Sequence, residues 1–276
     1  SAASDVYKRQ GIIHLHDCHE YFRGVPELVG RKTVIRVWKF FEDLIFPRLS
    51  RVTAVNQSIA EIYEKEYNVS LKVMRNLPGR KQNFGSKKKA ALNISGTQKI
   101  IFYQGALNID RGLEETILSI TYLQTDALLV LAGKGDIDEK LKQLVISENL
   151  AERVIFTGEI PLEELHEYTQ MADLGISVEK DVCVNYHYSL PNKLFDYIQA
   201  RVPVLVSPFP EVRALVDYYQ IGEFIQSHDP VELAKHFDRI LNDQDKIAFY
   251  KTNLQKAAQE LCWEHEEMVL VNILKT

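Results

Sequence analysis

Two basic side chains lie where a parallel sheet would place them beside a ligand. Arg111 lies in a loop that follows the apolar run 100–103 and contains Gly105 and Gly112, and Lys193 lies in the first turn of a predicted helix. Glycine lets the backbone approach a ligand closely, and a guanidinium can contact a phosphate through two nitrogens. The first amides of a helix also attract anions. Together these groups predict a site for a pyrophosphate, although the first loop alone would also fit an ordinary tight turn.

The predicted helix that contains Lys193 carries two further polar groups, Asn192 and Asp196. A lysine in the first turn opposes the helix dipole, and an anionic ligand would remove this conflict. Asp196 lies on the same face of the helix and could accept hydrogen bonds from ribose hydroxyls. The alternative is a surface ion pair between Lys193 and Asp196, which would contribute little stability.

A third loop carries two glycines close together, Gly133 and Gly135, directly after the apolar run 127–132. A base or a ribose could lie over this small loop, which by itself would also fit a simple turn.

A polar cluster lies near the start of the chain, after a strand predicted over residues 11–15. It contains Asp17, His19 and Glu20. A histidine beside carboxylates at the end of a strand can exchange protons near neutral pH. The alternative is a structural histidine that only forms hydrogen bonds.

The elements that position these loops alternate regularly from residue 99 to residue 243. Strands are predicted over 100–103, 127–132, 153–157, 174–178, 202–206 and 223–225. Helices are predicted over 113–123, 138–148, 162–171, 192–200, 211–218 and 230–242. Because these strands are continuous apolar runs between helices, they predict a complete, doubly wound parallel sheet. Ligands bind such sheets beyond the carboxyl ends of the strands.

Residues 11–77 predict a shorter α/β unit, with strands over 11–15, 52–55 and 71–74. Its helices are predicted over 32–49 and from a cap at Ser58 to residue 67. Residues 78–98, which include a run of lysines at 87–89, are interpreted as a linker, and residues 244–276 as closing helices. The aromatic helical segment from Trp38 to Arg51 could contact a membrane surface, but packing into a core is the commoner role of such a helix.

Composition excludes several classes of protein. The chain has 276 residues, of which 46% are hydrophobic and 26% are charged. Its formal net charge of −5 gives no indication of the basic face that a nucleic-acid-binding protein needs. No apolar run reaches the roughly 18 residues that span a bilayer. The three cysteines, Cys18, Cys183 and Cys262, match no metal spacing and indicate reduced thiols in a cytosolic protein.

Residues 1–10, Ser-Ala-Ala-Ser-Asp-Val-Tyr-Lys-Arg-Gln, resemble a translated sequencing adapter. On this interpretation the native sequence begins at Gly11, inside a fold, and the absence of a signal peptide carries no weight. The alternative is a genuine polar tail.

The ordered set of loops resembles the retaining nucleotide-sugar glycosyltransferases of family 4, which have the GT-B fold of two Rossmann-like domains. The match runs from about residue 11 to the end, and its motifs are Asp17-Cys18-His19-Glu20, Asn76-Leu77-Pro78, Tyr103-Gln104-Gly105-Ala106-Leu107, Arg111-Gly112-Leu113-Glu114, Leu131-Ala132-Gly133-Lys134-Gly135, Leu190-Pro191-Asn192-Lys193-Leu194-Phe195-Asp196-Tyr197 and Trp263-Glu264. The domains implied are an incomplete N-terminal acceptor domain over 11–77 and a donor domain over 99–243.

The resemblance implies transfer of a sugar from a nucleoside-diphosphate sugar to a glycan or lipid-linked acceptor, with no metal or other cofactor. Catalytic roles would fall to Arg111, in place of a diphosphate-binding lysine, to Lys193 and to His19. Donor contacts would come from Gly105, Gly133, Gly135, Asn192, Leu194 and Asp196, and acceptor-side contacts from Asp17 and Glu20. A cytoplasmic enzyme in peripheral contact with the inner membrane face is implied, one whose incomplete acceptor domain would transfer poorly.

One departure from the family motif concerns its two carboxylates, which are eight residues apart. The second corresponds to Asp196, but the position of the first holds Tyr188, for which Glu179, Asp181 or His187 could compensate. Two other functions therefore stay open, a GT-B sugar epimerase, which would need more carboxylates, and a non-catalytic partner of a transferase. The sequence fixes neither the sugar, the base, the acceptor nor the oligomeric state.

Overall fold

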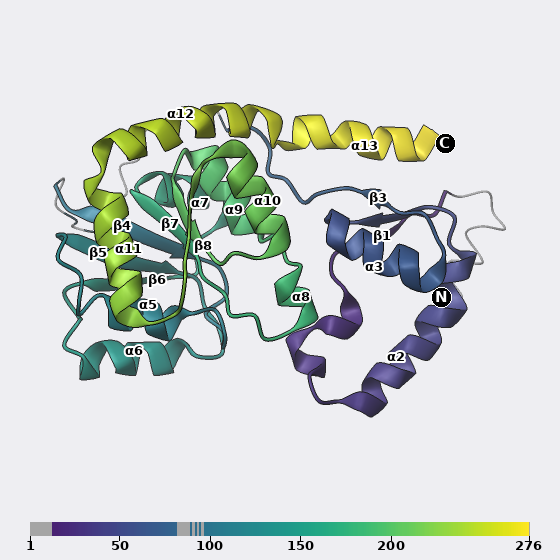
Figure 1. Ribbon diagram of the computed structural model, residues 1–276, viewed down its shortest axis with the longest axis horizontal. Helices are drawn as coiled ribbons and strands as arrows, with labels where there is room; N and C mark the ends of the chain where they lie inside the picture. The colour runs from purple at the N-terminus through teal and green to yellow at the C-terminus, as the bar shows by residue number, and fades with distance from the viewer. Residues whose placement is uncertain (1–12, 82–88, 90–91, 93, 95–96, 276) are drawn as a thin grey trace.

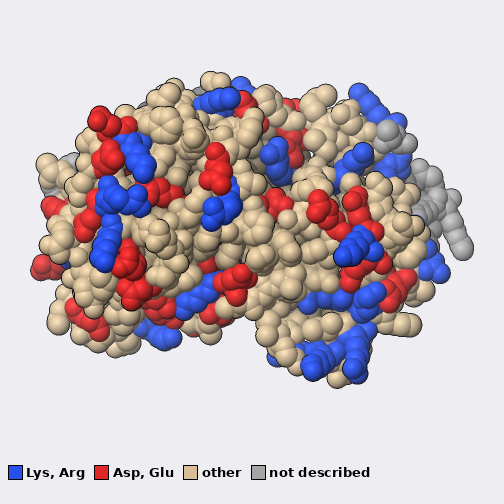
Figure 2. All heavy atoms as spheres, in the orientation of Figure 1, with Lys and Arg blue, Asp and Glu red and all other residues tan. Residues whose placement is uncertain are grey.

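The computed structural model describes residues 13–81, 89, 92, 94 and 97–275, and it contains two α/β parts, each built on a parallel sheet (Figure 1). The predicted adapter tail and most of the lysine run at 87–89 lie outside the described residues. In Figure 2 acidic and basic side chains mix over the larger part, whereas basic side chains gather along the lower edge of the smaller part.

The larger part is a six-stranded sheet in the order β6-β5-β4-β7-β8-β9, and every neighbouring pair is parallel. Its strands are β4 (Lys99–Gln104), β5 (Ala127–Ala132), β6 (Val154–Gly158), β7 (Leu174–Ser177), β8 (Val204–Val206) and β9 (Gly222–Phe224). The complete doubly wound sheet that the alternating pattern predicts is thereby confirmed.

Helices cover both faces of this sheet. They are α5 (Leu113–Ser119), α6 (Asp138–Ser147), α7 (Leu162–Gln170), α9 (Asn192–Ala200), α10 (Pro210–Tyr219), α11 (Pro230–Asn242) and α12 (Gln244–Glu260). Successive residues of a strand enter opposite cores: Ile100 and Phe102 pack with α9, α10 and α12, whereas Ile101 and Tyr103 pack with α5, α6 and α11. This alternation is the pleat of a strand that is buried on both sides.

The smaller part is a three-stranded parallel sheet in the order β1-β2-β3, with strands β1 (His16–Cys18), β2 (Val52–Ala54) and β3 (Lys72–Val73). The strand predicted over 11–15 is wrong, because of these residues only 13–15 are described and they lie outside any strand. Pairing with β2 sets the strand instead, since His16 lies opposite Val52 and the Thr53 hydroxyl donates to Asp17 at 2.7 Å.

The helices of the smaller part are α2 (Lys32–Ile45) and α3 (Gln57–Tyr67), with 3-10 turns η1 (Phe22–Gly24), η2 (Pro26–Leu28) and η3 (Phe46–Arg48). The predicted helix 32–49 ends early because the chain tightens into η3. Ser58 is not the cap of α3: the Asn56 side chain accepts a hydrogen bond from the Ile59 amide at 2.9 Å. Asparagine is among the strongest N-cap residues, so this role suits it.

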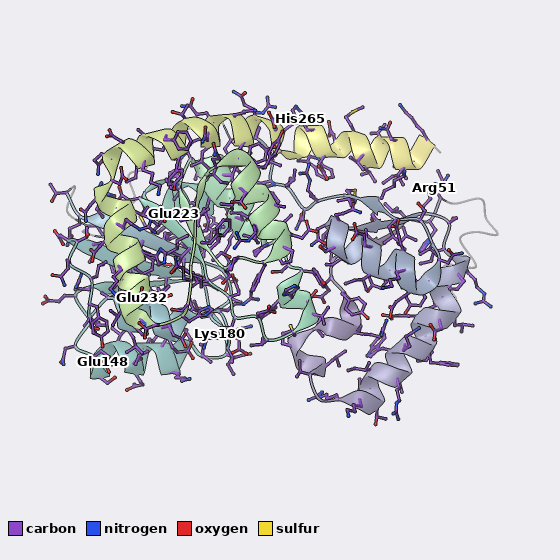
Figure 3. The ribbon with its side chains drawn as sticks, in the orientation of Figure 1. Arg51, Glu148, Lys180, Glu223, Glu232 and His265 are labelled. Carbon is purple, nitrogen blue, oxygen red and sulfur yellow. The ribbon has the colours of Figure 1, made fainter. Side chains whose placement is uncertain are left out.

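Two segments join the parts. The short helix α8 (Val184–His187), which the sequence did not predict, lies beside the smaller part, and α13 (Trp263–Lys275) runs over it (Figure 1). Arg75 forms an ion pair with Glu266 at 2.8 Å. At the far end of α13, the Arg51 side chain donates to the Ile273 carbonyl at 3.1 Å, and Figure 3 labels Arg51 there.

Gly133 has a backbone conformation that side chains disfavour, with φ of 137°, and a Cβ there would lie 2.0 Å from the Gly105 carbonyl oxygen. We expect Gly133→Ala to lower the free energy of unfolding by about 3 kcal/mol or more, from strain and steric overlap. Gly158→Ala is the matched control, because φ there is 70° and nothing lies within 4 Å. Gly158→Ala should lower the free energy of unfolding by only about 1–2 kcal/mol. Urea unfolding measures both, and equal losses would contradict the prediction.

Candidate functional site

A cavity of about 750 Å³ lies between the two parts, beyond the carboxyl ends of the strands of the larger sheet. Both parts contribute side chains to it. Those from the smaller part are His19, Glu20, Val55, Asn56, Ile59 and Asn76. The basic side chains from the larger part are Arg111, Lys134 and Lys193, and its acidic side chains are Glu159 and Asp196.

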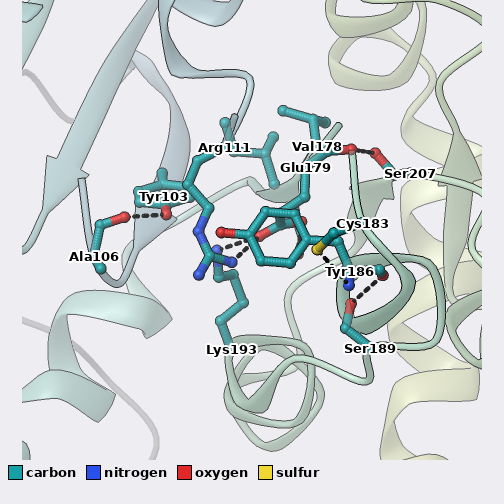
Figure 4. A network of polar contacts seen from close by, with 12 residues as sticks. Tyr103, Ala106, Arg111, Val178, Glu179, Cys183, Tyr186, Ser189, Lys193 and Ser207 are labelled. Atoms are coloured by element: carbon teal, nitrogen blue, oxygen red, sulfur yellow. Dashed lines mark hydrogen bonds and ion pairs between the residues drawn. The ribbon is translucent and has the colours of Figure 1, made fainter. Parts of the chain in front are cut away.

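Three charged side chains meet at one wall of this cavity (Figure 4). The Lys193 ammonium donates to Glu179 Oε1 at 2.7 Å, and an Arg111 guanidinium nitrogen lies 3.5 Å from the same oxygen. The Ser177 hydroxyl donates to Glu179 Oε2 at 2.8 Å. The sequence had placed Arg111 and Lys193 at a common site, and the structure brings them together around Glu179. The sequence had offered Glu179 only as a substitute for the missing motif carboxylate and not as a partner of these cations.

In this charged cluster, the opposite charges of the neighbours offset the effect of burial on each pKa. Burial would raise the pKa of Glu179, but the charge of Lys193, with help from Arg111 and Ser177, holds that pKa below its ordinary value. Burial would lower the pKa of Lys193 and of Arg111, yet the Glu179 carboxylate raises both. All three groups are therefore charged at neutral pH, and together they carry one net positive charge.

Aromatic rings hold the two cations from the other side. The Lys193 ammonium lies 4.0 Å from the centre of the Tyr103 ring, and the Arg111 guanidinium lies 4.7 Å from that of Tyr186. The Tyr103 hydroxyl donates to the Ala106 carbonyl at 2.8 Å, which fixes that ring. Cation–π contacts of this kind favour charged over neutral side chains.

Asp196 also lines the cavity and belongs to a separate hydrogen-bond chain. Its carboxylate accepts from the Gln104 amide at 2.7 Å, and Gln104 in turn accepts from the Thr169 hydroxyl at 2.7 Å. The surface ion pair between Lys193 and Asp196 is not formed, because Lys193 is buried against Glu179. Burial raises the pKa of Asp196 to about 6, against the opposing effects of Lys81 and Gln104.

The smaller part presents an exposed histidine to the cavity. His19 Nε2 lies 2.9 Å from Asp17 Oδ2, and two thirds of the His19 side chain is exposed. Glu20 also lines the cavity and accepts from the Asn185 amide of α8 at 3.2 Å. Asp17 is not among the lining residues, since its other oxygen is bound to Thr53.

The remaining predicted residues divide into two groups. Gly105, Gly133 and Asn192 line the cavity. Leu194 does not, because its side chain lies fully buried in the hydrophobic core. Gly135 packs against the loop at Leu107 instead.

None of the three residues that could compensate for Tyr188 presents a free carboxylate to the cavity. Glu179 is 2% exposed and both its oxygens are occupied. Asp181 and His187 form a pair at 2.7 Å outside the cavity lining. Sequence reasoning also missed Asn185 and Tyr186, which line the cavity, because they belong to the short helix α8 that the sequence did not predict. Asn56, which follows β2 closely, lines the cavity too, although no role there was predicted for it. Among the described residues, no three acidic, histidine or cysteine side chains group so as to hold a metal ion.

Comparison with known proteins gives one family match. Residues 85–260 match the model of the family described as glycosyl transferases group 1. A curated relative, the glycosyltransferase MJ1607 of Methanocaldococcus jannaschii, is 22% identical over 190 residues, which are 68% of this chain and 47% of the relative. The chain thus spans about half the length of that relative.

Solved structures with the GT-B fold superpose on nearly the whole chain. HepE of Anabaena, solved in complex with UDP, has a TM-score of 0.79 at 14% identity and covers 99% of this chain, which spans 75% of HepE. Sucrose-phosphate synthase of Thermosynechococcus elongatus has a TM-score of 0.77 at 20% identity, with 98% of this chain and 70% of the synthase covered. The predicted GT-B fold class is confirmed by these likenesses.

The raised pKa of Asp196 gives a testable dependence of stability on pH. Between pH 3.8 and about 6 the folded chain binds more protons at Asp196 than the unfolded chain, so stability falls as pH rises through this window. We expect Asp196→Asn to be more stable than the wild type at pH 8 by about 1–3 kcal/mol, and the gain to vanish near pH 4. Urea unfolding at both pH values measures this.

The matched control for this prediction is Asp217→Asn, at an exposed carboxylate of α10. It should show no such gain at pH 8. An Asp196→Asn variant that is less stable than the wild type at pH 8 would show that the ionised carboxylate stabilises the fold.

Proposed function

Since the chain belongs to the glycosyl transferases group 1 family, we propose that it transfers a sugar from a nucleoside-diphosphate sugar to a glycan or lipid-linked acceptor. The observation that supports this proposal most is the pair of cations, Arg111 and Lys193, at the wall of a cavity between two α/β parts. A diphosphate is the ligand that this charge and shape suit. Retention of the anomeric configuration is part of the proposal, and it is supported by the resemblance of residues 190–197 to the retaining family.

The chemistry proposed is electrostatic stabilisation of a departing diphosphate. Negative charge develops on that group as the bond to the sugar breaks, and cations at the wall of the cavity stabilise it. Arg111 and Lys193 supply the cations, and the first amides of α9 lie beside Lys193. We propose that these groups act without a metal ion. His19 and Glu20, from the smaller part, are the proposed contacts of the acceptor.

Uridine nucleotides are the first donors to test. HepE was solved with UDP and with UDP-glucose, and the Staphylococcus aureus protein TarM, also a structural neighbour, with UDP and a glycan. We propose a uridine-diphosphate hexose as the donor on this ground.

Binding is tested by thermal shift with UDP, GDP, ADP, CDP and TDP. Each diphosphate is compared with the corresponding nucleoside, which lacks the phosphates. We expect one diphosphate to stabilise the chain, by about 2.7 kcal/mol at a concentration one hundred times its Kd. Arg111→Met should weaken that diphosphate about tenfold to a hundredfold, because one charge-assisted contact is lost, and leave the nucleoside unchanged.

Lys142→Met, on the exposed face of α6, is the control for Arg111→Met. The proposed site would be refuted if none of the diphosphates stabilised the chain. It would also be refuted if the affinity for the diphosphate did not depend on Arg111. Transfer of the sugar from the donor to an added acceptor is then measured. A transferase gives this product, whereas an epimerase or a non-catalytic subunit does not.

The outer face of α2 supports a further part of the proposal, peripheral contact with a membrane. The exposed apolar side chains of this helix are Val34, Val37, Trp38, Phe40, Phe41 and Leu44. These side chains are therefore not packed into a core, which is the commoner role of such a helix. Exposed Arg31, Lys32 and Arg36 flank the apolar face, and basic side chains gather at this edge in Figure 2. An apolar face with a basic rim suits an anionic lipid surface. No described helix is long and apolar enough to cross a bilayer.

Sedimentation with vesicles of phosphatidylglycerol and phosphatidylcholine tests this contact. We expect binding that weakens as salt is added and that falls about tenfold in Phe40→Ser, which removes a side chain 64% exposed on α2. Leu162→Ser is the control, because that side chain is 81% exposed on α7, in the larger part. Equal losses in the two variants, or no binding by the wild type, would remove the membrane contact from the proposal.

A further inference from the structure

Glu179 is a buried carboxylate at the cavity wall to which the proposed transfer gives no role. It follows β7 by two residues and is 2% exposed. Its position is fixed from several sides: Ser177 donates to Oε2 at 2.8 Å, and the Ser207 hydroxyl donates to its backbone carbonyl at 2.5 Å. A carboxylate buried without partners would be costly, so these partners and the two cations define its role.

The two cations differ in how they meet this carboxylate. Lys193 lies 2.7 Å from Oε1 and its side chain is 9% exposed, whereas Arg111 lies 3.5 Å away and its side chain is 25% exposed. The Arg111 Nε atom is buried and has no hydrogen-bond partner among the described residues. Lys193 is thus held by a short contact, while Arg111 has a long contact and an unused Nε donor.

We propose that Glu179 is a positioning residue, which fixes Lys193 at the cavity wall as a permanent charge and leaves Arg111 able to turn toward an anionic ligand. Glu179 itself does not touch the ligand, because it is only 2% exposed and is not among the residues that line the cavity. The carboxylate also reduces the repulsion between the two cations, since both of them contact the same oxygen, Oε1 (Figure 4).

The charge state of Lys193 is the property that this arrangement controls. The groups that face Lys193 are Glu179 from the β7 exit, Arg111 from the loop before α5, and Tyr103 from β4. Burial and Arg111 act to lower the pKa of the lysine, and Glu179 supplies the main opposing effect. Removing only the negative charge of Glu179 should therefore let Lys193 lose its proton at a lower pH.

The test is a titration of Lys193 by its ¹³Cε chemical shift in the whole chain, with the signal assigned from Lys193→Arg. In the wild type we expect the midpoint of the Lys193 titration to lie above pH 10.5, the ordinary lysine value. In Glu179→Gln, which keeps the shape and an accepting oxygen, the midpoint should fall by at least one pH unit, a tenfold rise in the neutral fraction. Glu163→Gln, at an exposed carboxylate of α7, should leave the midpoint unchanged. An unchanged midpoint in Glu179→Gln would overturn the proposal.

A second variant keeps the charge but changes the position. Glu179→Asp shortens the side chain by one methylene, so Lys193 should stay protonated while its ammonium moves away from its place. We expect the affinity for inorganic pyrophosphate to fall about tenfold at pH 7.5 in this variant. Wild-type affinity in Glu179→Asp would show that the position of the carboxylate does not matter and would also overturn the proposal.

The titration and the pyrophosphate measurement together separate this inference from the proposed function. Only the pyrophosphate measurement rests on the proposed function. Lys193 titrates whether or not a nucleotide binds, so a chain that bound no nucleoside diphosphate would refute the donor site and leave the titration decisive for Glu179. Conversely, a chain that binds a diphosphate but shows the same Lys193 midpoint in Glu179→Gln keeps its donor site and loses the positioning role.

Discussion

The site depends on one electrostatic constraint, the burial of two cations at the tips of parallel strands. Lys193 and Arg111 can lie there only because Glu179 neutralises part of their charge and the rings of Tyr103 and Tyr186 cover their other sides. A buried charge without a partner would lose its proton or unfold its surroundings. The remaining positive charge is what makes the cavity a place for an anion.

The doubly wound sheet explains why these residues meet although they are far apart in the sequence. Strands β4 and β7 are hydrogen-bonded neighbours at the centre of the sheet, so the loops that follow them end at the same edge. Arg111 comes from the loop after β4, Glu179 from the loop after β7, and Lys193 from the helix that returns to the sheet. The smaller part then closes the cavity from the opposite side with His19 and Glu20.

Sequence reasoning succeeded where a single element decides the outcome. The bounds of β5 and α9 were predicted to the residue, because a continuous apolar run defines the first and Pro191 the start of the second. It failed at the cap of α3, where Asn56 takes the role predicted for the neighbouring Ser58. It also failed where distant residues decide, since β1 is set by its pairing with β2. The partner of Lys193 was missed for the same reason, since Glu179 lies 14 residues away in another loop and no local pattern marks it.

The ion pair between Arg75 and Glu266 joins residues 191 positions apart. During synthesis on the ribosome, β1, β2 and β3 emerge long before α13, and for that interval the smaller sheet lacks the helix that covers it. The contacts of Arg51 and Arg75 with α13 can therefore form only after the residues of the larger sheet have been synthesised.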